Sequence, residues 1–97
     1  MVYSWKEYRM NDNIEKLNKI IESNIIDLKR NVLECRTFSI DYNNFIYGFI
    51  YSSRNYTIYE YTLRIERERS YHELISISRS KLLLLLNLRN LWWRLES

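Results

Sequence analysis

Apolar and polar side chains alternate through the middle of this chain, and that alternation constrains its fold more than any other feature. Three stretches show it, over residues 37–41, 45–51 and 59–65. Successive side chains of a β-strand point to opposite faces of the sheet, so a period of two predicts strands with one buried face. We therefore expect a three-stranded antiparallel meander over residues 34–68.

Two short turns set the register of this expected sheet. Asn43 and Asn44 tolerate positive φ, so they predict a tight hairpin with Tyr42 opposite Phe45. The second turn, around Ser53-Arg54-Asn55, can close over two residues or over three, with Asn55 left-handed in the longer form. Only the three-residue loop aligns the apolar sides of both strands, so burial favours it. One sheet face would then be almost wholly aromatic and aliphatic, and the other mixed and exposed.

Helical periodicity appears on both sides of the expected sheet. Apolar residues recur at three and four positions from Ile14 to Leu28, which predicts a helix over residues 11–31 after an N-terminal segment, residues 1–10. Ser70 followed by Glu73 forms a capping box, so a long second helix is expected over residues 70–96. We expect a single α+β domain, residues 1–97, in the order α-β-β-β-α.

The expected second helix is apolar over well more than half of its circumference. A helix with so wide an apolar face normally packs on two sides. One side can contact the sheet and the first helix, so we expect a second copy of the chain to cover the other. Leu83, Leu86 and Trp93 are the predicted residues of this homodimer interface.

The composition removes several classes of function. Gly48 is the only glycine, so a glycine-rich phosphate loop cannot form. Cys35 and His72 are also single, which excludes an internal disulfide and leaves metal sites and histidine relays without enough ligands. We therefore expect no enzymatic activity, no cofactor and no bound metal.

The sequence also predicts where in the cell the protein is located. The opening ten residues mix polar and aromatic side chains, unlike a secretory signal, and the Leu82 to Leu86 run is too short to span a bilayer. We expect a cytoplasmic, intracellular protein with no membrane span and no small-molecule substrate.

The composition also bears on the origin of the gene. Proline is absent, and isoleucine, asparagine and tyrosine abound. This bias is typical of AT-rich genes, which are common in viruses and mobile elements.

The chain carries a net charge of +3, which makes polyanions conceivable partners. Arginines at five positions would contact phosphates in a nucleic-acid-binding module: Arg54, Arg64, Arg67, Arg79 and Arg94. The expected element order from residue 11 onward resembles that of the double-stranded-RNA-binding domain. Asn43-Asn44 stands where that family has a glycine-proline-histidine loop, and no lysine cluster opens the second helix. The resemblance implies RNA binding through likeness of fold alone.

Three functions follow from these patterns. The first is a non-enzymatic interaction protein, a homodimeric viral or mobile-element regulator or inhibitor that docks on a host protein. The second is the nucleic-acid-binding module with its arginine contacts. The third is a small metal-dependent nuclease that holds its ion through Asp41 and Glu60.

Overall fold

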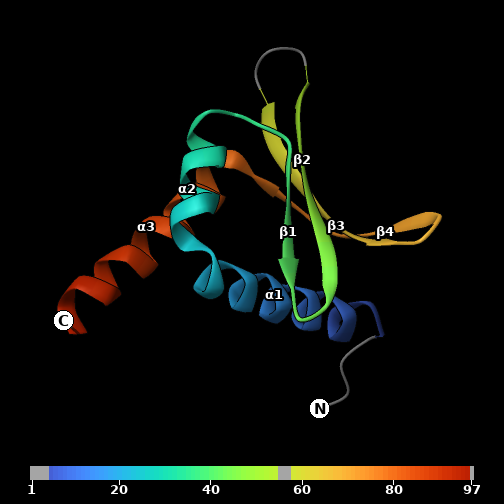
Figure 1. Ribbon diagram of the computed structural model, residues 1–97, viewed down its shortest axis with the longest axis horizontal. Coiled ribbons are helices and arrows are strands. Elements are labelled where there is room, and N and C mark those ends of the chain that lie inside the picture. The colour runs from blue at the N-terminus through green and yellow to red at the C-terminus, as the bar shows by residue number, and fades with distance from the viewer. Residues whose placement is uncertain (1–4, 55–57, 97) are drawn as a thin grey trace.

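A computed structural model describes residues 5–54 and 58–96, and within them the side chains of residues 12–53 and 59–88. These ranges form an α+β fold with a single antiparallel sheet, ordered β1-β2-β3-β4 (Figure 1). The elements in chain order are α1 (Trp5–Ser23), α2 (Ile25–Leu33), β1 (Phe38–Tyr42), β2 (Phe45–Arg54), β3 (Ile58–Arg67), β4 (Ser70–Ser78) and α3 (Arg79–Glu96). The α+β class is confirmed, but the sheet has four strands where three were predicted.

β4 occupies the segment that the capping box assigned to a helix. Ile75 pairs with Leu63 and Ile77 with Tyr61, so β4 extends the apolar face of β3. The capping box is a local signal, whereas the free edge of β3 offers hydrogen bonds and an apolar face together. Helix α3 starts after the strand, where the Lys81 amide donates to Ser78 Oγ at 3.2 Å. The predicted order α-β-β-β-α is therefore wrong at this strand, and so is the likeness to the RNA-binding domain that rested on it.

The predicted first helix is two helices that meet at Asn24. Ser23 Oγ donates to the Lys19 carbonyl at 3.0 Å, and this bond takes one of the last acceptors of α1. Asn24 has φ −139° and ψ 34°, so its backbone leaves the helical conformation there. The change of direction lets Ile21 of α1 and Leu28 of α2 both reach the core, where neither is exposed.

The predicted register of the first hairpin is confirmed. Tyr42 lies opposite Phe45 across the Asn43-Asn44 turn, and both turn residues have positive φ. In the second hairpin the apolar sides of β2 and β3 share one face, as predicted, but the predicted turn position is wrong. β2 continues to Arg54, which pairs with Ile58, so Phe49 is opposite Leu63 and not Tyr59. The predicted conformation of Asn55 itself lies outside the described residues.

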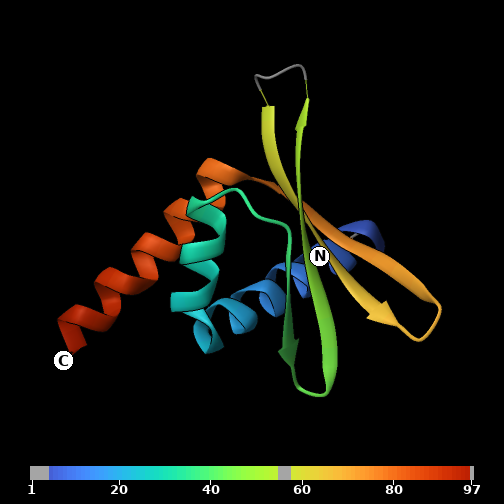
Figure 2. The same ribbon diagram turned by 45° about the horizontal axis from the view of Figure 1, so that its top comes forward.

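The core lies between one face of the sheet and the helices. Figure 2 shows α1 crossing this face, with α2 and α3 beside it. The buried side chains come from both layers: Leu17, Ile20, Ile21, Leu28, Val32, Leu82 and Leu86 from the helices, and Ile40, Tyr47, Phe49, Tyr61, Leu63, Ile65 and Ile77 from the sheet. On the opposite face, which we call the open sheet face, Ile46 is 45% exposed.

A β-bulge connects β4 to α1. Ile75 is opposite Leu63 while Glu73 is opposite Arg64, so Leu74 is an extra residue in β4. Asn13 Nδ2 of α1 donates a hydrogen bond of 2.7 Å to the Leu74 carbonyl. A bulge leaves a backbone group without its ladder partner, and this side chain supplies the missing donor.

Candidate interaction surfaces

Arg79, a predicted phosphate contact, binds the end of α2. Its Nε donates to the Val32 carbonyl and its Nη2 to the Leu33 carbonyl, both at 3.0 Å. The last carbonyls of a helix have no donor within the helix and lie at the negative end of its dipole. The guanidinium of Arg79 therefore caps α2 and attaches it to the first residue of α3.

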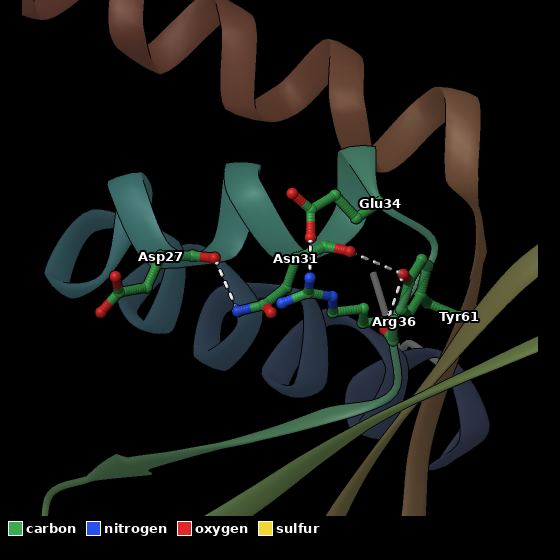
Figure 3. A network of polar contacts seen from close by, with 5 residues as sticks. All are labelled: Asp27, Asn31, Glu34, Arg36 and Tyr61. Carbon is green, nitrogen blue, oxygen red and sulfur yellow. Dashed lines mark hydrogen bonds and ion pairs between the residues drawn. The ribbon is translucent and has the colours of Figure 1, made fainter.

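The same end of α2 has two further caps, and Figure 3 shows the one that Tyr61 provides. Cys35 has φ 55°, and the Arg36 amide returns to the Asn31 carbonyl at 3.0 Å, which is the pattern of a Schellman motif. The Tyr61 hydroxyl donates to the Arg36 carbonyl at 2.8 Å and approaches that of Asn31 at 3.4 Å. Burial raises the pKa of Tyr61 to about 12, and nearby Arg79 opposes this rise. Tyr61 thus stays protonated and remains a donor.

Arg64 lies on the open sheet face among side chains that hold it there. Its Nη2 contacts Glu66 Oε1 at 3.3 Å, and its Cζ lies 4.3 Å from the centre of the Tyr71 ring. A guanidinium over an aromatic face is an attractive cation–π arrangement. Its Nε is buried against Gly48 and has no hydrogen-bond partner among the described residues. Most of this guanidinium is therefore engaged within the chain.

The remaining predicted arginines do not gather with these two. Arg54 pairs with Ile58 at one end of the β2–β3 ladder, and Arg67 ends β3 at the other. A span of nine residues along a strand is about 30 Å. Arg94 belongs to α3, and the side chains of Arg54 and Arg94 lie outside the described part of the chain. The structure thus spreads the five arginines over several places.

The predicted nuclease carboxylates are far apart. Asp41 pairs with Ile46, whereas Glu60 pairs with Ser52, six residues farther along β2. This separation is about 20 Å along the strand, too far for one metal ion to bridge. Among the described residues, no three His, Cys, Asp or Glu side chains are placed to hold a metal ion.

Within α3, the exposed side chains are not the ones that the sequence predicted for a dimer interface. Leu86 is 0% exposed and belongs to the core, Leu83 is half-buried against that core, and the Trp93 side chain lies outside the described residues. Leu84 and Leu88, which the sequence reasoning missed, are 57% and 52% exposed. Residues 82–86 and 88 are all leucine, so periodicity alone could not show which of them face inward.

Helix α2 adds exposed aliphatic side chains on the helical layer. Ile26 is 73% exposed and Leu33 is 51% exposed. A shallow groove runs along this helix and is lined by Ile25, Ile26, Lys29, Arg30 and Leu33. We call the four exposed aliphatic residues of the two helices, Ile26, Leu33, Leu84 and Leu88, the outer helical surface.

Comparison with known proteins does not add to this picture. No protein family, no curated protein and no solved structure matches the chain. Among the described residues, no helix combines the length and the hydropathy that crossing a membrane requires.

Proposed function

We propose that this chain is a non-enzymatic interaction protein that docks on another macromolecule through the outer helical surface. The observation that carries the proposal is the exposure of four large aliphatic side chains, each more than half exposed, on α2 and α3. Burying a fully exposed side chain of this kind stabilises a complex by about 1.5–3 kcal/mol before the costs of association, and these partly buried side chains would contribute roughly half to three quarters of that. Four of them give a docking surface its main driving force.

The polar residues around these side chains fit a docking surface. Lys29 and Arg30 line the groove beside Ile26 and Leu33, so the apolar part has a charged rim. Interfaces commonly combine an apolar centre with a polar rim that fixes orientation. Exposed apolar side chains with such a rim are typical of protein contacts.

Contact with nucleic acid receives less support from the arginines. Arg79 binds two carbonyls of α2, and Arg64 packs on Tyr71 and Glu66. Phosphate binding needs cations that are free to neutralise a backbone. We therefore favour a protein partner, and the AT-rich composition suggests a viral or mobile-element regulator or inhibitor of a host protein.

Site-specific photo-crosslinking in cells that produce the protein tests this proposal. Benzophenone side chains replace Ile26 and Leu88 on the outer helical surface, and Tyr71 on the open sheet face serves as a control of similar size and exposure. We expect adducts of higher mass from positions 26 and 88, because docking brings another chain within reach, and none from position 71. Equal capture at all three positions, or no capture at any, would contradict the proposal.

A further inference from the structure

Helix α3 presents leucines on two opposite sides. Leu82 and Leu86 are fully buried against the sheet and the other helices, whereas Leu84 and Leu88 are more than half exposed. At about 100° per residue, Leu84 points about 160° away from Leu86. The contacts of this chain therefore occupy one side of α3 and leave the other without a partner among the described residues.

The exposed leucines begin a heptad pattern. The step from Leu84 to Leu88 is four residues, and the sequence continues with Leu91 three residues later and Leu95 four residues after that. All four positions fall within α3, although the side chains of the last two lie beyond the described ones. Alternating steps of four and three define the a and d positions of a coiled coil, where each side chain fits between four residues of a facing helix.

We propose that α3 pairs in antiparallel orientation with α3 of a second copy of this chain, with Leu84, Leu88, Leu91 and Leu95 as the seam. This inference rests on the proposed function, because it names the macromolecule that docks on the α3 part of the outer helical surface. We keep the predicted homodimer, but its interface lies on the side of α3 opposite Leu86 and does not include Leu86.

A second copy suits this seam because a line of identical leucines complements itself. A two-fold axis brings the same patch of both chains together, so each leucine layer faces another leucine layer. Leu85 and Asn87, which flank the described part of the seam at the e and g positions, carry no charge. No like charges therefore meet along this part when two copies approach.

Charge also selects the antiparallel orientation. Lys81 is exposed and lies one heptad before Leu88, on the line of the seam. In a parallel pair, the two Lys81 ammonium groups would face each other across the axis. In an antiparallel pair, each Lys81 approaches the negative end of the partner's helix dipole, where α3 ends at Glu96. The same cation that opposes one arrangement supports the other.

Sedimentation equilibrium of the purified full chain, from low micromolar to submillimolar concentration, tests the pairing. We expect a reversible dimer with micromolar dissociation, because a seam of four layers is short. The double variant Leu84→Glu with Leu88→Glu is expected to remain monomeric with an unchanged circular dichroism spectrum. Ile46→Glu, a matched change of an exposed aliphatic residue on the open sheet face, is expected to dimerise like the parent.

A parent chain that stays monomeric throughout, or a double variant that dimerises like the parent, would overturn the inference. The proposed function has a separate outcome. Photo-crosslinked adducts from position 88 that contain a different protein, together with a monomeric parent chain, would reject the second copy and still support docking. A dimer in solution combined with its own adducts from position 88 supports both.

Carbodiimide crosslinking, which joins an amine to a carboxylate with no spacer, tests the orientation. Within one α3, Lys81 and Glu96 are separated by about 22 Å of helix, so they cannot be joined inside a single chain. An antiparallel pair predicts a crosslinked peptide that contains both residues, and the double glutamate variant should lose it. A dimer that yields no such peptide would contradict the antiparallel arrangement.

Discussion

Removing the Arg79 guanidinium should weaken the packing of α2 against the start of α3 and destabilise the fold. Its two hydrogen bonds, both 3.0 Å long, reach the Val32 and Leu33 carbonyls. A hydrogen bond to a charged group contributes about 1.5–3 kcal/mol, and partial exposure of the guanidinium reduces that figure. We therefore expect Arg79→Ala to lower the free energy of unfolding by about 2 kcal/mol. Arg79→Lys keeps the charge but loses the planar guanidinium that donates to both carbonyls, so it should lower the free energy of unfolding by about half of that.

Urea denaturation followed by far-UV circular dichroism measures both changes. Lys19→Ala is the matched control, because Lys19 is an exposed cation of helix α1 and its described hydrogen bond is accepted by its backbone carbonyl. A surface change of this kind should shift stability by less than about 0.5 kcal/mol. Equal effects of the Arg79 and Lys19 changes would refute the capping role. So would a loss below about 0.5 kcal/mol for Arg79→Ala.

Three further changes test other parts of the structure. Tyr61→Phe should cost about 1–2 kcal/mol, because it removes the donor of the partly buried 2.8 Å bond to the Arg36 carbonyl, whereas exposed Tyr71→Phe should cost little. Since the folded pKa of Tyr61 is raised from 10.0 to about 12, its contribution is complete below pH 10 and is lost as pH rises through 12. The free energy of unfolding, measured by urea titration at several pH values across that range, should therefore decrease less steeply with pH for Tyr61→Phe than for the parent. Gly48→Ala should destabilise by about 1 kcal/mol, since its Cβ would lie 3.1 Å from Glu66 Oε1, and an unchanged melting temperature would refute this close contact. Cys35→Gly should stabilise by about 0.5–1 kcal/mol in thermal melts, because φ is 55° there; a lower melting temperature would show that the thiol itself contributes.

The register of the first hairpin, and the face that β3 shares with β2, could be predicted because each has a physical cause visible in the sequence. Asn43 and Asn44 provide the two positive φ values that a tight hairpin needs, and both are observed. In the second hairpin burial selects the shared apolar face, since only an odd loop puts Tyr51 and Tyr61 on the same side. Burial does not determine which residues pair, and β2 extends to Arg54, two residues beyond the predicted start of the turn.

β4 could not be predicted by the same reasoning because its local signals conflict. Ser70 and Glu73 match a helix cap, while Ile75 and Ile77 are spaced for a strand. What decides between them is the free edge of β3, a tertiary feature that no local pattern contains. Ser78 takes the capping role instead, at the point where the sheet ends.

The candidate site shows a similar division. That α3 has more apolar surface than one core can cover was visible from its composition, but which leucines form the excess was not. Arg79 illustrates the converse problem, because an arginine that caps a neighbouring helix has the same sequence signature as one that contacts phosphate. Only the position of the α2 carbonyls, fixed by how the chain turns after Leu33, distinguishes the two roles.

The start of α3 connects the corrected fold to the proposed dimer. The sequence predicted a helix from Ser70, but residues 70–78 form β4 and α3 begins at Arg79. Because β4 occupies that segment, α3 is held at two places. Arg79, its first residue, binds the end of α2, and Leu82 and Leu86 pack in the core. The rest of the circumference is then free to carry a second line of leucines. The fourth strand thus explains why the chain can satisfy its own core and still have an apolar seam for another molecule.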